Sequence, residues 1–246
     1  MITISIVSHL QAALVAGLLR DIESHCKSPP ARVILTLNVE EPLGFRPDDF
    51  SFSLEIIRNP ARRGFGANHN AAFRRATGRY FCVLNPDVRF SGNPFPSLLK
   101  AIADESVGAV SALVLDPEGA IEDHARRFPR VATVLRKALP GSRQDYPDLG
   151  RAARSVEWIA GMFMLFRSAV FREVGGFDER YFLYYEDVDL CARLRAAGYD
   201  IRVEPAARVV HDARRESRRN VRRMARHLIS MARYLFTRPR SLPPLG

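Results

Sequence analysis

The chain has 246 residues, three cysteines and a formal net charge of +10. This length suits one α/β domain with an appendage, or two small domains, and it buries a sizeable core. The cysteines lie far apart and form no Cys-x-x-Cys pair, which argues against a disulfide framework or a zinc knuckle and favours a reducing compartment. Residues 211–246 contain ten arginines and two acids, so +8 of the total charge lies there and the rest of the chain is close to neutral.

The first residues alternate between apolar and hydroxyl side chains. They lack the basic region and the cleavage site of a signal peptide, and we expect them to form a strand. No apolar run in the chain is long enough to span a bilayer. We therefore expect a cytoplasmic protein.

Strand and helix patterns alternate in the first half of the chain. The run at 80–84 is short and apolar, as is usual for a central strand of a parallel sheet. Strands are predicted at 2–8, 32–38, 52–58, 80–84 and 107–115, and helices at 11–22, 64–76 and 95–103. This order favours a doubly wound, mostly parallel sheet that is flanked by helices.

The second half is less regular. Residues 117–149 are rich in proline and predict a long excursion with one short helix near 131–138. Residues 156–167 are apolar around a glycine. Helices are predicted at 168–174 and 187–197, each followed by glycine, and a strand is predicted at 199–204.

The segment 174–193 carries five carboxylates among several aromatic side chains. Burial beside apolar rings disfavours the charged form of a carboxyl group, so carboxylates in such a place cost free energy unless the protein uses them. They are candidate general bases or metal ligands. The five are Asp178, Glu179, Glu186, Asp187 and Asp189.

A second candidate site follows the predicted strand 80–84. Asn85 and Asp87 lie at the carboxyl end of this strand, where open α/β sheets bind ligands. One carboxylate beside a diphosphate is enough to hold Mg²⁺ or Mn²⁺, although Asn-Pro-Asp is equally consistent with an ordinary turn. His211 follows an apolar run and could complete a metal site with Asp87, while a further group orients its other ring nitrogen. A lone histidine is nevertheless more often structural or solvated than a ligand.

The segment 62–70 joins a predicted strand to a predicted helix. Gly64 and Gly66 would let the backbone approach a phosphate, the helix N-terminus favours an anion, and Arg62 or Arg63 could add a charged contact. The glycine spacing matches neither a P-loop nor a complete dinucleotide-binding fingerprint. An ordinary capped turn is the commoner explanation of such a segment.

Trp158 is the only tryptophan in the chain. It is either a core aromatic or a platform for a sugar ring. Gly161, three residues later, would leave room for a ligand beside it.

In combination, these motifs resemble a family 2 glycosyltransferase of the GT-A fold, closest to the bacterial rhamnosyltransferase-like branch that builds surface polysaccharide. The resemblance covers roughly residues 2–212, and chance agreement of five separated motifs in order is improbable. The motifs are residues 64–70, 84–87, 158–163 and 175–190, followed by His211. The resemblance implies an α/β fold of GT-A type with a Rossmann-like, mostly parallel central sheet that is flanked by helices.

The resemblance also assigns roles to individual residues. It implies that Asp187 is the catalytic base with Glu186 beside it, and that Asp87 and His211 bind a Mg²⁺ or Mn²⁺ ion. Asn85 stands in place of the first acid of the family's Asp-x-Asp element. The remaining implied contacts are Val7, Ser8, Asn38, Arg63, Gly64, Gly66, Asn70 and Asn85 for the nucleotide sugar, and Trp158, Gly161 and Asp189 for the acceptor.

Two positions depart from the family pattern. Leu37 precedes Asn38 where family members commonly carry an Asp that contacts the base. His9 and Leu10 follow Ser8 where a Tyr-Asn or similar pair is usual. Both changes fall in the base pocket, so the resemblance leaves the chemistry intact but does not identify the nucleotide.

The C-terminal segment predicts a basic amphipathic helix. Its apolar residues recur at steps of three and four and line one face, which consists of Val221, Met224, Leu228, Met231 and Leu235. Most of its arginines fall elsewhere on the helix. Through residues 214–236 it could lie on an anionic membrane surface, or it could pack on the catalytic domain or a partner chain and keep its arginines in water. Both alternatives stay open.

The resemblance implies an inverting, metal-dependent glycosyltransferase. By analogy, it moves rhamnose from dTDP-rhamnose to a hydroxyl of a cell-surface polysaccharide or lipid-linked glycan. The expected domains are a glycosyltransferase domain at 1–212, with a nucleotide-binding half at 1–115 and a catalytic and acceptor half at 150–212, and a basic helix and tail at 213–246. We expect the enzyme in the cytoplasm, at the inner face of the bacterial membrane if the tail binds lipid, and a homo-oligomer stays open.

Three other functions compete with this interpretation. A non-enzymatic nucleic-acid-binding protein would use the arginine-rich tail, but the charge is confined there and no recognition module is visible, so we expect no nucleic acid. A sugar nucleotidyltransferase would also place a metal beside a glycine-rich turn, yet it does not explain the motif at 175–190. A non-catalytic member of the same fold is suggested by the departures at Leu37 and His9.

Overall fold

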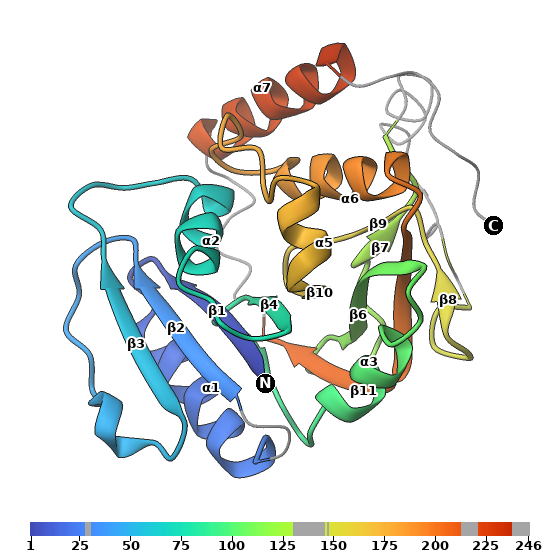
Figure 1. The fold of residues 1–246 in the computed structure, drawn as a ribbon. Helices are drawn as coiled ribbons and strands as arrows, with labels where there is room; N and C mark the ends of the chain where they lie inside the picture. Colours follow the sequence, from blue (N-terminus) through green and yellow to red (C-terminus); the bar gives the residue numbers. More distant parts are fainter. Residues whose placement is uncertain (28–30, 130–145, 147, 213–220, 238–246) are drawn as a thin grey trace.

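The chain forms one large mixed sheet with helices on both sides. The computed structural model describes residues 1–27, 31–129, 146, 148–212 and 221–237 (Figure 1). Within these residues, nine strands join in the order β3-β2-β1-β4-β10-β6-β11-β5, with β8 paired to β11. They are β1 (Ile2–Ser8), β2 (Ala31–Leu37), β3 (Ser53–Arg58), β4 (Tyr80–Leu84), β5 (Val88–Arg89), β6 (Val107–Leu115), β8 (Arg154–Ser155), β10 (Phe163–Arg167) and β11 (Asp200–His211). A separate small sheet pairs β7 (Ala125–Arg126) with β9 (Trp158–Ile159).

Most of the long strands run parallel, as predicted. β1 is parallel to β2 and β4, β2 is parallel to β3, and β6 is parallel to β11. β10 is antiparallel to both β4 and β6, and the short strands β5 and β8 are antiparallel to β11. β1, β2, β3, β4, β6 and β11 therefore end at the same edge of the sheet, which is the edge where open α/β sheets bind ligands.

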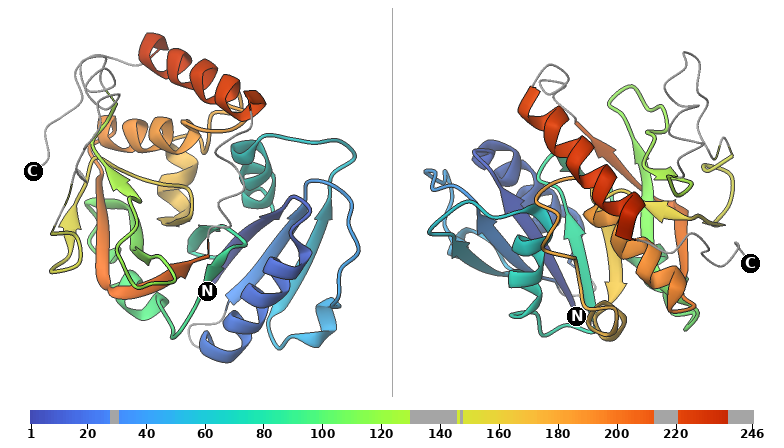
Figure 2. Two further views of the ribbon diagram at one scale, coloured as in Figure 1. Left: turned by 180° about the vertical axis from the view of Figure 1, so that it is seen from behind. Right: turned by 90° about the horizontal axis from the view of Figure 1, so that it is seen from above.

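Helices cover both faces of this sheet (Figures 1 and 2). α1 (Ala12–His25) and α3 (Phe95–Ala101) share one apolar layer with the sheet. α2 (Phe65–Phe73), α5 (Ser168–Glu173) and α6 (Glu186–Ala196) share the layer on the opposite face. A short 3-10 helix, η1 (Pro47–Asp49), precedes β3, and α7 (Val221–Thr237) is the outermost helix in Figure 2. None of the helices described is both long and apolar enough to cross a membrane.

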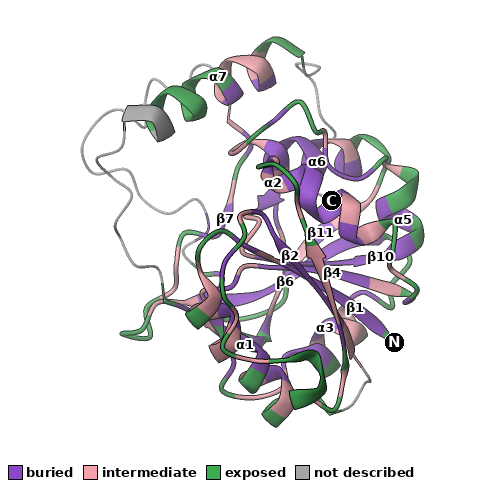
Figure 3. Ribbon diagram, turned by 90° about the vertical axis from the view of Figure 1, so that its left-hand side faces the viewer, coloured by how far each residue is buried: buried purple, intermediate pink, exposed green. Residues whose placement is uncertain are grey.

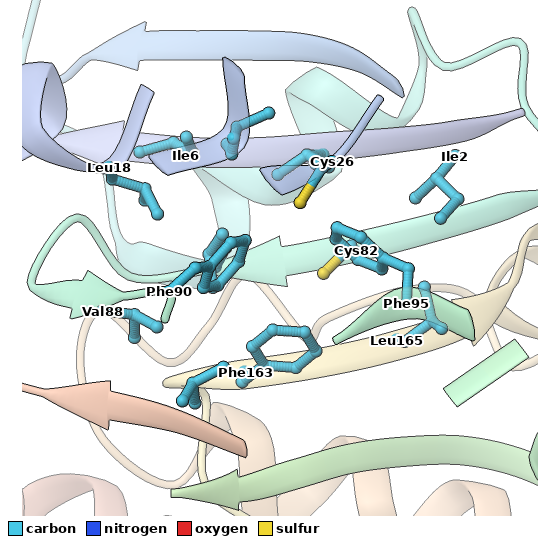
Figure 4. Packing of buried hydrophobic residues seen from close by; sticks show 14 of the residues in the cluster. Ile2, Ile6, Leu18, Cys26, Cys82, Val88, Phe90, Phe95, Phe163 and Leu165 are labelled. Atoms are coloured by element: carbon cyan, nitrogen blue, oxygen red, sulfur yellow. The ribbon is translucent and has the colours of Figure 1, made fainter. Parts of the chain in front are cut away.

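The alternation of side chains along β1 explains how it serves both layers. Ile2, Ile4 and Ile6 are fully buried on the α1 side, and Figure 4 shows Ile2 and Ile6 in the same cluster as Leu18 of α1. Burial of each such side chain stabilises the fold by about 1.5–3 kcal/mol. Ser5, which alternates with them, instead bonds to the ring of His69 on α2 at 2.8 Å.

The strands of the first half lie within one residue of their predicted positions. α1 continues three residues further than predicted, and α2 ends three residues earlier. The largest difference is β11, which was predicted at 199–204 and continues to residue 211 through an irregularity between Glu204 and Arg208. Pro205 has no N–H to donate, so it interrupts the ladder and hides the continuation from a pattern search. The helix predicted near 131–138 lies outside the described residues.

Candidate active site

One end of the candidate site is built by the pairing of β5 with β11. Val88 of β5 lies opposite His211, and this register brings Asp87 beside the histidine. His211 Nε2 lies 3.3 Å from Asp87 Oδ2, and His211 Nδ1 lies 2.8 Å from Glu122 Oε2. Glu122 therefore holds the ring by one nitrogen while the other faces Asp87. The structure brings the predicted pair together and supplies an orienting acid that the sequence did not single out.

The donor atoms at this end fit a divalent cation. Asp87 Oδ1 is buried and has no hydrogen-bond partner, which costs free energy unless a ligand satisfies it. Burial lowers the pKa of His211, but hydrogen bonds and charge from Asp87 and Glu122 outweigh burial and raise the pKa overall. In the part of the chain that the structure describes, no group of three or more His, Cys, Asp or Glu side chains could hold a metal alone. Asp87 and His211 would thus share Mg²⁺ or Mn²⁺ with phosphate oxygens and water.

The other end of the site is the N-terminus of α6, which begins with Glu186 and Asp187. Asp187 Oδ2 accepts a 3.1 Å hydrogen bond from the Gly161 N–H, and Oδ1 accepts a 2.8 Å bond from the Val188 N–H. The first turn of a helix also favours negative charge. Glu186 is buried, and its Oε2 has no hydrogen-bond partner. The two adjacent carboxyl groups therefore have very different surroundings.

These surroundings separate the proton affinities of the pair. Burial, followed by the charge of Asp187, raises the pKa of Glu186 well above its usual value. Burial also raises the pKa of Asp187, while the N–H groups of Val188 and Gly161 and the charge of Arg126 oppose the shift. Asp187, whose two oxygens each accept a backbone N–H, is therefore better suited to carry the negative charge of the pair, and Glu186 is better suited to hold a proton. A carboxylate with a raised pKa is suited to accept a proton.

Two tyrosines with left-handed backbone precede this pair. Tyr184 has a φ of 70° and Tyr185 has a φ of 68°. For a residue other than glycine, this conformation costs about 1–2 kcal/mol and persists only where the surroundings enforce it. Tyr185 is the N-cap of α6, so the strained tyrosines determine where Glu186 and Asp187 lie.

Backbone contacts join the two ends of the site. The Asn85 N–H donates a 3.0 Å hydrogen bond to the carbonyl of Met162, the neighbour of the Gly161 that holds the base end. The segment 122–126 also connects them. Its first residue, Glu122, contacts His211, and the charge of its last residue, Arg126, lowers the pKa of Asp187. The structure thereby gathers at one sheet edge three residues that are remote in sequence, namely Asp87, Asp187 and His211.

The glycines of segment 64–70 are required first for packing. A Cβ added to Gly66 would lie 2.5 Å from Phe177 Cβ, and one added to Gly64 would lie 2.7 Å from the Phe182 carbonyl oxygen. The Phe65 N–H, at the start of α2, already donates to that carbonyl at 2.9 Å. Neighbouring chain thus occupies the side of each glycine where a Cβ would stand, and the predicted contact of these glycines with a nucleotide sugar stays a prediction.

Two asparagines of the predicted nucleotide pocket hold loops in place. Asn38 Oδ1 accepts a bond from the Arg63 N–H at 2.8 Å, and its Nδ2 donates to the Arg63 carbonyl at 2.9 Å. Asn70 makes the same pair of bonds with the backbone of Phe177, at 2.9 and 2.8 Å. Direct contact of these amides with a nucleotide would compete with the loops. Val7, Arg63 and Asn85 are half-buried.

Glu41 is a buried acid near this edge that the sequence did not single out. Its carboxylate accepts hydrogen bonds from the Ser8 hydroxyl and from the backbone N–H groups of residues 10–12, at the N-terminus of α1. Leu37, which replaces the acid usual in the family, is buried in the core and cannot contact a base. The sequence signal for Glu41 was an acid a few residues after the end of β2, and such a pattern is too common to indicate a functional residue.

The three predicted acceptor residues are all engaged by neighbouring protein groups, and their contact with an acceptor stays a prediction. Asp189 is fully buried, and its Oδ2 accepts a 2.8 Å bond from Arg193 Nε, so it belongs to the packing of α6. Trp158 is 8 % exposed, and the Arg126 guanidinium covers its ring at 5.5 Å. Gly161 is adjacent to a phenylalanine ring and not to open space. The half-buried Arg126, which covers the Trp158 ring, is a further candidate for acceptor contact.

Comparison with known proteins identifies the family. Residues 49–230 match the model of the family described as Glycosyltransferase like family 2. The chain belongs to this family. This family 2 glycosyltransferase therefore catalyses sugar transfer, and the sugar nucleotidyltransferase and non-enzymatic alternatives are set aside.

Named relatives support the rhamnosyltransferase-like branch. The glycosyltransferase is 34 % identical over 185 residues to the rhamnosyltransferase WbbL of Escherichia coli (strain K12), a match that covers 70 % of each chain. It is 37 % identical over 141 residues to an N-acetylglucosaminyl-diphospho-decaprenol L-rhamnosyltransferase of Mycobacterium tuberculosis, covering 52 % of this chain and 45 % of that protein. The predicted resemblance is confirmed.

Solved structures confirm the GT-A type fold. The mannosyltransferase PcManGT from Pyrobaculum calidifontis, in complex with GDP-Man and Mn²⁺, has a TM-score of 0.68 at 20 % identity over 99 % of this chain and 66 % of that chain. GalNAc-T7 with UDP, GalNAc and Mn²⁺ has a TM-score of 0.68 at 15 % identity over 94 % and 47 % of the two chains. At these identities, the likeness concerns the fold alone.

Proposed function

We propose that this glycosyltransferase transfers its sugar with inversion of configuration at the anomeric carbon, depends on a divalent metal, and uses Asp187 as its general base. The observation that carries the proposal is the different surroundings of two adjacent carboxyl groups at the start of α6: Asp187 accepts two backbone N–H groups, whereas Glu186 Oε2 is buried without a partner. A single base serves a single displacement. The acceptor oxygen bonds to the anomeric carbon as the bond to the diphosphate oxygen breaks, and the hydroxyl proton passes to Asp187 Oδ.

Asp87 and His211 are the metal ligands in this proposal. A bound Mg²⁺ or Mn²⁺ stabilises the charge that grows on the leaving diphosphate. Glu122 fixes the His211 ring by its Nδ1, so that Nε2 stays directed toward Asp87. Asp87 and His211 would thus act on the leaving diphosphate through the metal, while Asp187 at the N-terminus of α6 accepts the proton of the incoming hydroxyl.

Rhamnose from dTDP-rhamnose is the proposed donor substrate. The support is the printed activity of the relatives, two of which are named above as rhamnosyltransferases. The residues at the end of β2 give less support to a dTDP donor, because Leu37 is buried and Asn38 is hydrogen-bonded to the backbone of Arg63. Neither residue is therefore available to select a base.

The proposed acceptor is a hydroxyl of a cell-surface polysaccharide or lipid-linked glycan, at the inner face of the cell membrane. One relative is named for an acceptor that joins a sugar to decaprenol through a diphosphate. The guanidinium of Arg126 lies over Trp158 and close enough to Asp187 to influence its pKa. An acceptor that carries phosphate would match this cation.

A ligand screen followed by a transfer assay tests the proposal. Thermal shifts are measured with nucleoside diphosphates and nucleotide sugars, each with and without Mn²⁺. We expect the largest shift with a dTDP compound and Mn²⁺, and then transfer from dTDP-rhamnose to a glycan hydroxyl with inversion at the anomeric carbon, read by NMR. Retention of configuration would contradict the single displacement, and a metal-independent shift would contradict the metal site.

A further inference from the structure

The helix α7 presents an apolar face to solvent. Four of its large apolar side chains are more than half exposed, namely Met224 at 57 %, Leu228 at 51 %, Ile229 at 64 % and Phe236 at 89 %. Their spacing, with Ala225 and Ala232 between them, places them on one continuous side of the helix. Figure 3 shows the exposed residues along α7, which lies at the periphery of the molecule. A contiguous exposed apolar surface of this kind marks an interaction site.

The opposite side of α7 holds the helix to the protein. Ser230 Oγ donates a 2.9 Å hydrogen bond to the Leu183 carbonyl. The ring of His227 lies 5.3 Å from the rings of Tyr184 and Tyr185. Ser230 and Tyr234 are buried. The apolar side chains of α7 are therefore divided: Tyr234 and Leu235 pack on the protein, whereas the four named above face solvent, unlike those of an ordinary surface helix.

We propose that the outward face of α7 lies on an anionic lipid bilayer, and that its inward face then fixes the loop that positions Glu186 and Asp187. The second clause rests on the proposed function; the first does not. The sequence left membrane binding and packing on the protein as alternatives, and the two faces allow both at once.

The charge of the C-terminal segment selects a bilayer as the occupant. α7 contains no acid, and residues 211–246 carry ten arginines against two acids. Arg226 lies 4.4 Å over the Phe182 ring and Arg233 lies 5.9 Å over the Tyr181 ring, so both guanidinium groups are close to the docked loop. Two copies of so basic a segment would repel each other across a dimer interface, whereas anionic headgroups attract it. Apolar side chains with arginines beside them are the usual composition of an interfacial helix.

The contacts of α7 connect the bilayer to catalysis. Tyr184 and Tyr185 have left-handed backbone, which surrounding contacts must enforce. His227 packs on both tyrosines, and Tyr234 lies 5.7 Å from Tyr185. Glu186 follows directly in the chain. His227 is thus a positioning residue for the base, and α7 is the element through which membrane contact reaches the site.

Vesicle co-sedimentation tests the first clause. The full chain is mixed with vesicles of equal parts phosphatidylglycerol and phosphatidylcholine, or of phosphatidylcholine alone. We expect binding to the anionic vesicles only, and less at high salt. The double variant Met224→Asp with Leu228→Asp loses binding by about tenfold or more. The control Ala13→Asp with Ala103→Asp makes the same charge change at exposed positions near α1 and α3 and keeps binding.

Three results would overturn this clause: wild type that stays in solution with both vesicles, an outer-face variant that binds like wild type, or a wild-type dimer in light scattering that the outer-face variant dissociates. Circular dichroism verifies that each variant is folded. These readouts need no sugar transfer, so they stand even if the proposed function fails.

His227→Ala tests the second clause. This variant should keep vesicle binding but lower kcat for a water-soluble acceptor, with little change in the donor KM. His227→Phe retains a ring against the tyrosines and should restore part of kcat. An unchanged kcat in His227→Ala would remove the link between α7 and the base. A higher donor KM together with a lower kcat would instead show a general structural role for His227, and would equally overturn its role in positioning the base.

Discussion

The two ends of the candidate site treat carboxyl groups in opposite ways. At the metal end, Asp87 and Glu122 lie within 3.3 Å of opposite nitrogens of one histidine ring and raise its pKa, and Asp87 Oδ1 is left without a hydrogen-bond partner. At the base end, Glu186 is buried without a hydrogen-bond partner for Oε2, and burial raises its pKa. One end is arranged to bind positive charge and the other to hold and receive protons. The comparison indicates that the leaving group and the attacking hydroxyl are served by separate electrostatic environments at one sheet edge.

The largest effect is expected from neutralising the base. Asp187→Asn should lower kcat by about 10²–10⁴-fold, because the amide cannot accept the acceptor proton. Steady-state transfer kinetics measure the effect. Asp178→Asn, in the same segment, serves as the control, since Asp178 pairs with Arg180 and not with Gly161. Near-normal turnover in Asp187→Asn would remove this residue from its role.

A smaller effect is expected at the acid that supports the histidine. Glu122→Gln weakens the hold on His211 Nδ1 and should raise the Mn²⁺ concentration needed for half-maximal activity by about 10–100-fold. Titration of activity with Mn²⁺ measures the change. The exposed Glu118, changed to Gln, is the matched control. If the two variants need the same Mn²⁺ concentration, Glu122 does not support a metal ligand.

The pH dependence of activity reports the surroundings of Asp187. Burial raises the pKa of Asp187 above the ordinary aspartate value of 3.8, and the base must be ionised to act. Activity should therefore fall as pH decreases through this raised pKa, by about tenfold per pH unit below it. A kcat profile between weakly acidic and neutral pH measures the fall. A profile that stays flat down to the range of an exposed aspartate would contradict the proposed environment.

The smallest expected effect is on stability. The pKa of Glu186 is raised above its ordinary value of 4.5 in the folded protein, so the folded state binds this proton more tightly than the unfolded chain does. The contribution of this group to stability is therefore lost as pH rises through the folded pKa. Glu186→Gln removes the titration, and its Tm should exceed that of wild type more at alkaline than at acidic pH. The gain is a few degrees, given about 2–4 °C per kcal/mol for chains of this size. A pH-independent difference in Tm would count against the buried-proton assignment.

The sequence was most informative where local pattern determines structure. Short apolar runs bounded by turn residues located β1, β4 and β6, and the motif order identified the family. Asp87 and His211 could be paired because each follows a short apolar run and because the motif order resembles that of the family. Their partner Glu122 could not be found, because it lies in a proline-rich segment and reaches the histidine only through the tertiary fold.

Glycines and amides have packing roles that the sequence did not reveal, for a related reason. Gly64, Gly66 and Asn70 are predicted to contact a nucleotide, and each also contacts residues 177–182, more than a hundred positions away. Glycine permits close approach of any group, and a sequence does not say which group approaches. The burial of Asp189 within α6 was hidden likewise, because an acid in a helix is usually solvated.

Calorimetric titration with dTDP and Mn²⁺ tests the division of labour between the two ends most directly. Wild type, Asp87→Asn and Asp187→Asn are titrated under the same conditions. We predict that Asp187→Asn binds the nucleotide as wild type does while lacking turnover, and that Asp87→Asn loses the Mn²⁺-dependent part of binding. Equal loss of binding in both variants, or Mn²⁺-dependent binding that survives in Asp87→Asn, would contradict the account.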